Sequence, residues 1–261
     1  MARHKGRGWH GRLLAAALGV TALAAATSVW TAQAHPVGVR QPQARVSAPD
    51  ARPQDRTVAK VAADIAHASD RGPRGVNITI DDGPDPVWTP QVLQLLKDSG
   101  VKATFCMVGM QAQAYPDLVK EVVAAGHRLC NHTVSHDTTM DTKSEAYQSQ
   151  QILDAERMIT EASGGVRPPQ YYRAPGGAFT PYSRQLAASR GMRPLGWNVD
   201  SRDFERPGVD TMVATVKREI SDGPTVLFHD AGGDRSQTVA ALREVLPWLR
   251  QQGYVFGFPV R

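Results

Sequence analysis

From residue 76 to the C-terminus, short apolar runs alternate with longer amphipathic stretches. The short runs are rich in β-branched and aromatic residues, which favours buried strands, whereas the long stretches repeat apolar residues with a helical period. Strands are predicted at 76–80, 103–108, 128–131, 171–173, 193–199, 225–229 and 254–258. Helices are predicted at 89–99, 115–125, 144–163, 181–190, 210–221 and 237–252.

This alternation of strands and helices with short connections implies a parallel sheet. Seven units in about 186 residues predict an α/β fold, a distorted (β/α) barrel with about seven parallel strands. A doubly wound open sheet is the alternative. In either fold, ligands bind at the C-terminal ends of the strands, so reactive residues are expected directly after strands.

The first 75 residues have a different character. Residues 1–34 combine a basic start, an Ala-rich apolar stretch and a closing Ala-Gln-Ala, which predicts a signal peptide. An uncleaved membrane anchor is the alternative, and membrane association is expected only in that case. Residues 35–75, rich in Pro, Ala, Gln and charged residues, predict a flexible linker. We therefore expect a secreted protein, extracellular or in the cell wall, whose folded domain spans 76–261.

Charge excludes one class of partner. The chain has 30 Lys+Arg and 25 Asp+Glu, a formal net charge of +5. Residues 1–34 hold four basic and no acidic side chains, so the rest of the chain carries 26 minus 25, or +1. This balance leaves no electrostatic footprint for nucleic acid, and we expect no nucleic-acid partner. We expect a monomer.

Reactive residue types do cluster after the predicted strands. The first strand ends at Asp81 and Asp82, and His132 and His136 follow the third. Two histidines four residues apart share one side of a helical turn, and together with one carboxylate they make a three-ligand metal site with a position open for water. Either aspartate can be the third ligand, and the other can then act as a base. Later strand ends carry Arg173, Asp200 with Asp203 close behind, and His229.

The two cysteines, Cys106 and Cys130, lie in the second and third predicted strands. In an exported protein a disulfide is favoured over two buried thiols, provided that the two strands are neighbours. Cys130 also lies two residues before His132, which allows a metal-ligand interpretation, but better ligands are at hand.

Taken together, these motifs resemble the polysaccharide deacetylase family, also called the NodB-homology domain or carbohydrate esterase family four. The resemblance extends in motif order over roughly residues 76–230. It implies a distorted barrel that binds a divalent metal, usually Zn²⁺, with Co²⁺ or Mn²⁺ as alternatives. It also implies that Asp82, His132 and His136 bind the metal, that Asp81 is the general base and that His229 is the general acid.

The same resemblance implies supporting roles for four further residues. Arg173 would pair with Asp81 and lower its pKa, and Asp200 would orient and tune the catalytic histidine. Gly176 would offer a backbone N–H to the oxyanion, and Leu227 would form the wall for the acetyl methyl group.

Three positions depart from the family pattern without removing a reactive group. Ile80 stands where Phe is common, Gly176 where an aromatic residue is frequent, and Phe204 where Trp is usual. Trp88 and Trp197 lie near strand ends, where their flat faces can stack on a sugar ring. Core packing is an equal alternative for Trp197 and a weaker one for Trp88, so Trp88 is a predicted substrate contact.

The sequence therefore predicts a secreted, metal-dependent deacetylase. The expected reaction removes N-acetyl groups from N-acetylglucosamine units of peptidoglycan or chitin-type glycans and releases acetate. One alternative is an acetyl xylan esterase that hydrolyses O-acetyl groups, because the same site can attack either carbonyl. The alternative from another class is a cell-wall glycan-binding protein that has lost its activity.

Overall fold

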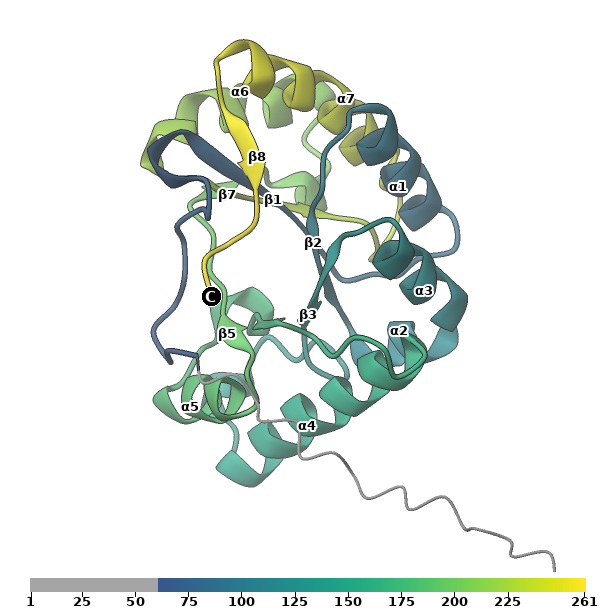
Figure 1. Cartoon of the computed structure of the whole chain (residues 1–261), viewed down its shortest axis with the longest axis vertical. Helices are drawn as coiled ribbons and strands as arrows, with labels where there is room; N and C mark the ends of the chain where they lie inside the picture. The colour runs from purple at the N-terminus through teal and green to yellow at the C-terminus, as the bar shows by residue number, and fades with distance from the viewer. Residues whose placement is uncertain (1–60) are drawn as a thin grey trace, which may run out of the picture. The chain divides into compact units, whose positions relative to one another are not determined.

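The computed structural model describes residues 61–261 (Figure 1). The predicted signal peptide and residues 35–60 of the predicted linker lie outside these residues. Among the described residues, no helix has the length and apolar character needed to cross a membrane.

The described end of the predicted linker, residues 61–75, lies against the domain that follows. Isolated bridges join Ala66 to Leu195 and Ser69 to Pro259, and the side chains of Ala66 and Ser69 are buried. The short 3₁₀ helix η1 (Gly72–Arg74) then leads into the first strand.

Eight strands form one parallel sheet in the order β5-β4-β3-β2-β1-β7-β6, with β8 pairing the beginning of β1. Their bounds are β1 (Gly75–Asp81), β2 (Thr104–Met107), β3 (Arg128–Asn131), β4 (Tyr171–Tyr172), β5 (Arg193–Pro194), β6 (Val199–Asp200), β7 (Thr225–His229) and β8 (Val255–Gly257). The seven strands of the main path curl into a half-barrel, which confirms the predicted distorted barrel.

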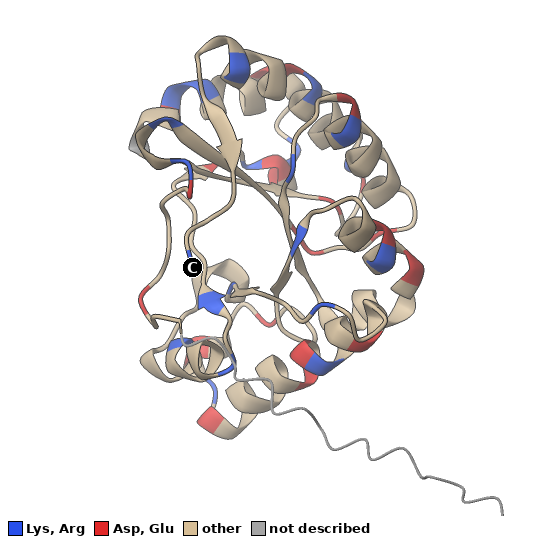
Figure 2. Cartoon of the chain, viewed as in Figure 1, with Lys and Arg blue, Asp and Glu red and all other residues tan. Residues whose placement is uncertain are grey.

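Seven α-helices lie around the outside of the curved sheet (Figure 1). Their bounds are α1 (Trp88–Asp98), α2 (Gly109–Ala114), α3 (Pro116–Ala124), α4 (Glu145–Ala162), α5 (Pro181–Ser189), α6 (Val209–Glu219) and α7 (Ser236–Gln251). The six predicted helices are confirmed to within about two residues at each end, and α2 is an addition. Basic and acidic residues are interspersed over these helices and the loops, with few on the strands (Figure 2).

The central strand β1 separates an apolar layer from a polar interior. All seven of its residues are buried, as expected for a parallel strand covered on both faces. Ile78 and Ile80 belong to the main hydrophobic core, together with residues of the flanking helices. Thr79 and Asp81 point to the opposite face, where both contact the side chain of Arg173. The strand thus delivers Asp81 into the interior of the half-barrel.

The predicted strand at 193–199 is wrong as a single element. It is split into β5, which pairs with β4, and β6, which pairs with β7, at opposite edges of the sheet. Residues 195–198 cross between the two edges, so the half-barrel is closed by a segment of chain and not by a ladder of hydrogen bonds. The guanidinium group of Arg173 holds this crossing by donating to the carbonyl oxygens of Leu195 at 3.2 Å and Gly196 at 2.8 Å.

Candidate active site

A cavity of about 350 Å³ opens at the C-terminal ends of the strands. Its lining gathers residues from five different strand ends, as the sequence predicted for a parallel sheet. The lining residues are Asp81, Asp82, His132, His136, Thr138, Ala174, Gly176, Trp197, Asp200, Phe204, Leu227 and His229. Of the predicted site residues, only Arg173 and Trp88 are missing from this wall.

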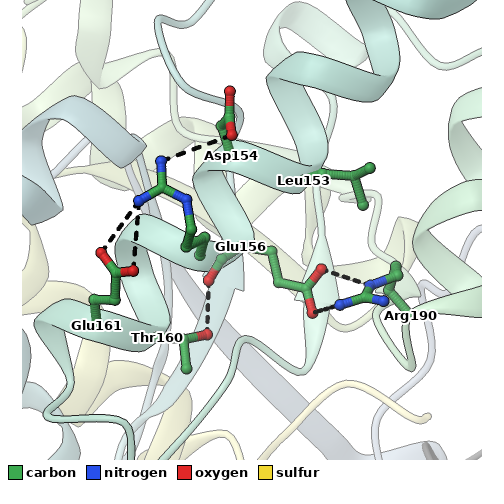
Figure 3. Close-up of a pocket in the computed structure, with 7 residues that line it drawn as sticks. Leu153, Asp154, Glu156, Thr160, Glu161 and Arg190 are labelled. Carbon is green, nitrogen blue, oxygen red and sulfur yellow. Dashed lines mark hydrogen bonds and ion pairs between the residues drawn. The ribbon is translucent and has the colours of Figure 1, made fainter.

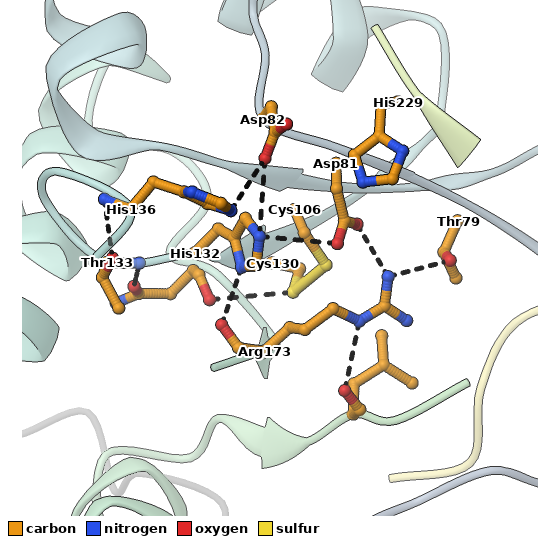
Figure 4. Close-up of polar contacts among 12 residues, drawn as sticks. Thr79, Asp81, Asp82, Cys106, Cys130, His132, Thr133, His136, Arg173 and His229 are labelled. Atoms are coloured by element: carbon orange, nitrogen blue, oxygen red, sulfur yellow. Dashed lines mark hydrogen bonds and ion pairs between the residues drawn. A yellow bond between two sulfur atoms is a disulfide. The ribbon is translucent and has the colours of Figure 1, made fainter. Parts of the chain in front are cut away.

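Three predicted metal ligands converge at one side of the cavity (Figure 4). One ligand atom from each of Asp82, His132 and His136 lies within 4.8 Å of the others. Asp82 Oδ1 is 3.2 Å from His136 Nε2 and 3.6 Å from His132 Nε2. This oxygen is buried and accepts no hydrogen bond from any described residue. A buried carboxylate oxygen facing two imidazole nitrogens fits a divalent cation, and the donor set of two histidines and one carboxylate suits Zn²⁺.

The environment of His132 determines which of its ring nitrogens carries the proton. Its Nδ1 lies 2.8 Å from the carbonyl oxygen of Arg173, which can only accept, so Nδ1 carries the proton. The lone pair of Nε2 is therefore directed towards Asp82, as a metal ligand requires. Burial lowers the pKa of His132 to about 3, which keeps the ring neutral.

The backbone around the ligands is held by β2 and β3. Asp82 and His136 have positive φ angles of 77° and 57°, in the left-handed region that is uncommon for residues other than glycine. The Asp82 N–H donates to the Cys106 carbonyl at 3.1 Å. Cys106 and Cys130 are paired in register across β2 and β3 and form a disulfide, with 4.1 Å between their Cα atoms. The predicted disulfide is confirmed, and it joins β3, which precedes His132 and His136, to β2, which lies between β3 and β1 in the sheet.

Asp81 is held by the fully buried Arg173. Arg173 Nη1 donates to Asp81 Oδ1 at 2.7 Å and to Thr79 Oγ1 at 2.9 Å, and Asp81 Oδ2 lies 3.5 Å from His132 Nε2. Burial raises the pKa of the Asp81 carboxyl above its usual range, and the Arg173 charge only opposes that rise. Arg173 lowers this pKa as predicted, but burial is the larger effect, so the net pKa of Asp81 is raised.

His229 is paired with Asp203 and not with Asp200. His229 Nδ1 lies 2.7 Å from Asp203 Oδ1, and the His229 N–H donates to Asp203 Oδ2 at 2.9 Å. Burial alone would lower the pKa of His229, but the hydrogen bond and charge of Asp203, with smaller contributions from Asp82 and Asp81, outweigh it and raise the pKa to about 9. The ring is therefore protonated at neutral pH, with Nε2 as its free donor.

The role predicted for Asp200 is corrected by this geometry. Asp200 ends β6 and lines the cavity, but its Oδ1 accepts from the Arg202 N–H at 2.9 Å. Arg202 has a φ of 57°, which turns the chain back and starts the 3₁₀ helix η4 (Asp203–Glu205). The strand-end rule selected Asp200, whereas the turn brings Asp203 to the histidine. The signal in the sequence was Asp203 itself, a second carboxylate three residues after the strand end. The ring of the next residue, Phe204, packs edge-on against the His229 ring at 5.6 Å.

Two of the three predicted substrate contacts line the cavity, and the third does not. Gly176, with a φ of 59°, and Leu227, on β7, both line the cavity. Trp88 does not: it lies in the first turn of α1 and packs against the hydrophobic core, so this prediction is wrong. Trp197 lines the cavity in its place, and its ring lies 5.5 Å from the Arg173 guanidinium carbon.

A second, smaller cavity of about 250 Å³ adjoins the first. The two share Asp82 and His136, so the ligand cluster lies where they meet. The second cavity is lined by residues after β2, β3 and β7, including Met110, an apolar side chain that is 56% exposed. An elongated molecule could therefore extend past the ligand cluster.

A hollow on the surface of α4 lacks such features (Figure 3). Its charged groups satisfy one another: Arg190 Nε bonds Glu156 at 2.8 Å, and Arg157 pairs with Glu161 at 3.3 Å and with Asp154 at 3.7 Å. Exposed ion pairs of this kind are ordinary on helix surfaces. We assign no function to this hollow.

Known proteins share both the sequence and this architecture. A family model described as polysaccharide deacetylase matches residues 68–195. A peptidoglycan-N-acetylglucosamine deacetylase of Bacillus cereus is 41% identical over 183 residues, which cover 69% of this chain and 84% of the relative. A chitooligosaccharide deacetylase of Sinorhizobium fredii is 36% identical over 199 residues, covering 72% of this chain and 91% of the relative. A crystal structure of a peptidoglycan N-acetylglucosamine deacetylase, in complex with 4-naphthalen-1-yl-N-oxidanyl-benzamide, matches with a TM-score of 0.69 at 30% identity, over 74% of this chain and 90% of that one.

Proposed function

Because the chain belongs to the polysaccharide deacetylase family, hydrolases of carbon–nitrogen bonds other than peptide bonds, we propose that it removes N-acetyl groups from N-acetylglucosamine residues of peptidoglycan or chitin-type glycans. One observation carries the proposal. A buried carboxylate, Asp81, and a protonated histidine, His229, are paired residues of β1 and β7. They lie beside the three predicted metal ligands, of which Asp82 has a buried oxygen that accepts no hydrogen bond from the described residues.

The metal would be held by Asp82, His132 and His136. When bound, a divalent cation lowers the pKa of a coordinated water and polarises the acetyl carbonyl. Zn²⁺ is the cation that we propose, because its common ligands include exactly these two side-chain types and its catalytic sites leave one position open.

Asp81 supplies the base. Its Oδ2 faces the ligand cluster, while its Oδ1 is fixed by Arg173, so a single oxygen is available to take the proton of the attacking water. The pKa that burial raises makes this carboxylate a stronger base than an exposed aspartate. Arg173 keeps the carboxylate oriented during the transfer.

His229 supplies the acid. An amine is a poor leaving group until it is protonated, and the pKa of about 9 keeps His229 protonated when the substrate binds. Asp203 fixes the ring so that Nε2 can donate to the departing nitrogen. An alkoxide leaving group needs this proton less, so the acid matters more for amide hydrolysis than for ester hydrolysis.

The walls suit an acetylated sugar. Leu227 offers an apolar surface for the acetyl methyl group, and the Trp197 ring lines the cavity where a sugar face can stack. The second cavity beyond His136 supports a glycan of more than one unit. Peptidoglycan and chitooligosaccharide are the substrates in the names of the relatives, and both consist of linked units.

We also propose that the protein acts outside the cytoplasm. Residues 1–34 have the composition of a signal peptide. The Cys106–Cys130 disulfide supports the same proposal, because disulfides persist mainly in oxidising compartments.

Acetate release from peptidoglycan, chitooligosaccharides and acetylated xylan tests the function. We expect a chelator to abolish release from the first two substrates and Zn²⁺ to restore it. Asp81→Asn should lower kcat by about 10² to 10⁴-fold, the usual contribution of a positioned base. Asp154→Asn, which removes an exposed acid on α4, serves as the control and should leave activity unchanged. Activity that is indifferent to chelation or to Asp81→Asn would refute the mechanism, and xylan as the preferred substrate would refute the N-deacetylase assignment.

A further inference from the structure

Asp230, the residue after His229, is completely buried and takes no part in the chemistry described above. Its Oδ2 accepts a hydrogen bond from Thr89 Oγ1 at 2.5 Å. Its Oδ1 is buried and has no hydrogen-bond partner among the described residues. A buried polar atom without a partner costs free energy, so the presence of a polar side chain here calls for a physical reason.

The reason lies in what Asp230 contacts. A Cβ atom added to Gly83 would lie 2.2 Å from Asp230 Oδ1 and 2.7 Å from Oδ2, so the carboxyl group is packed directly onto the glycine. The Asp230 N–H also donates to the Asp81 carbonyl at 3.1 Å. Main chain and side chain of Asp230 therefore both touch the segment that contains the metal ligand Asp82.

That segment needs support, because Asp82 has a φ of 77°. A left-handed conformation in a residue other than glycine persists only where the surroundings impose it. The loop after β2 gives part of this support, since Val108 N–H donates to the Gly83 carbonyl at 3.1 Å. The carboxyl group of Asp230 gives the rest by filling the space beside Gly83.

Thr89 connects this contact to the start of α1. Its hydroxyl donates to Asp230 and accepts from the Asp85 N–H at 2.7 Å. Asp85 Oδ1 in turn accepts from the N–H groups of Val87 at 2.8 Å and Trp88 at 3.0 Å, at the beginning of the helix. The Asp230 side chain is thus held by a hydrogen-bonded chain that ends on a rigid element.

We propose that Asp230 is a positioning residue that holds the turn at Gly83 so that Asp82 Oδ1 faces the two histidine ligands. The inference rests on the metal site of the proposed function. It assigns the effect to shape and hydrogen bonding, because the hydroxyl of Thr89 can donate to a carboxyl or to an amide oxygen alike. Groups that orient a metal ligand in this way typically change metal affinity by about 10 to 100-fold.

Zinc titration of the metal-free, full-length protein tests the proposal, at a temperature where circular dichroism shows every variant folded. We expect Asp230→Ala to weaken Zn²⁺ binding by about 10 to 100-fold and Asp230→Asn to stay close to the wild type. Thr89→Val, which keeps the shape but removes the hydroxyl, should weaken binding without opening a cavity, so the proposal can be tested even where Asp230→Ala does not fold. Asp234→Ala removes an exposed acid of the same loop and is the control, with unchanged affinity expected.

The outcomes separate the two levels of inference. Wild-type affinity in Asp230→Ala and Thr89→Val would overturn the positioning role while leaving the metal site intact. An Asp230→Asn variant as weak as Asp230→Ala would also overturn it, since charge would then matter more than shape. A wild-type protein that binds no Zn²⁺ would refute the metal site and this inference with it.

Discussion

At the residue scale, the proposed direction of proton transfer depends on two carboxylates in different surroundings. Asp81 is buried beside a guanidinium group, and Asp203 is buried beside an imidazole. The first has a raised pKa and is a competent base, whereas the pKa of Asp203 is lowered, burial notwithstanding, by its bonds to His229 and Thr238. Because Asp203 stays ionised, its charge is what keeps His229 protonated.

The pH profile of the enzyme should report this pair. His229 must be protonated to act as the acid, so activity is lost as the pH rises through its pKa of about 9. Asp203→Asn removes the charge that raises this pKa, and the alkaline limb of kcat/KM should move to lower pH with a lower maximum. Asp200→Asn is the matched control, and its limb should stay near that of the wild type. A shift in the Asp200 variant alone would return the role to that residue.

The candidate site residues could be selected from the sequence because most of them lie at the end of a strand or directly after it. Asp81, Asp82 and His229 are examples, and the register of β1 and β7 aligns the first with the last. Asp203 could not be selected in this way, since it reaches His229 only through a turn at Arg202 with a positive φ. The net pKa shift of Asp81 was likewise hidden, because it depends on burial in three dimensions and not on the neighbouring charge alone.

At the element scale, the short helix α2 lines the second cavity. It begins at Gly109, whose N–H donates to the Thr133 carbonyl at 2.8 Å, so its first turn lies beside the loop that carries His132 and His136. Six residues give too few turns for a helical period to stand out, which is why the sequence did not predict it. The adjoining disulfide strands, in contrast, were predictable from their apolar runs.

This helix makes the second cavity testable. Met110 exposes an apolar side chain in the second cavity, on the path proposed for a longer glycan, and Met110→Ala should remove a surface for the neighbouring sugar. We expect kcat/KM for chitotetraose to fall by about fivefold, on the order of 1 kcal/mol for one lost apolar contact, while that for chitobiose changes less. Leu153→Ala, an exposed apolar residue on α4, is the control. An equal loss for both substrates would place the glycan elsewhere.

At the scale of the whole molecule, the described strands do not close the barrel by pairing with one another, and yet the half-barrel surrounds a buried polar centre. Arg173 lies at that centre with no exposed surface, and it bonds Asp81 on one side and the crossing segment at 195–198 on the other. Six of the seven predicted strands, and the parallel direction of the sheet, followed from the alternation of apolar runs with amphipathic stretches. The break in the predicted strand at 193–199 did not, because its two halves pair with strands that are far apart in the sequence.

A buried histidine far from the site gives the molecule a predictable response to acid. His127 follows α3 and packs edge-on against Phe105, and its Nδ1 accepts from the Ala103 N–H at 3.0 Å. Burial lowers the pKa of His127 to about 4, and the positive charge of Lys102 makes a smaller contribution in the same direction. Because the pKa of His127 is lower in the folded state than the unfolded value of about 6.5, protonation of its ring destabilises the folded protein. The contribution of the neutral ring to stability is complete above pH 6.5 and is lost as the pH falls towards 4.

Urea unfolding of the metal-free protein between pH 7 and pH 4 measures this contribution against His127→Asn, whose side-chain oxygen can still accept from Ala103. The difference in unfolding free energy between wild type and variant should shrink by roughly 3 kcal/mol over this range, at about 1.4 kcal/mol for each unit of pKa. Taking the difference cancels the other buried groups that titrate, such as His132 and Asp230, because both proteins contain them. Parallel curves for the two proteins would show that His127 is not neutral and buried in the folded state, since only that state ties its protonation to unfolding.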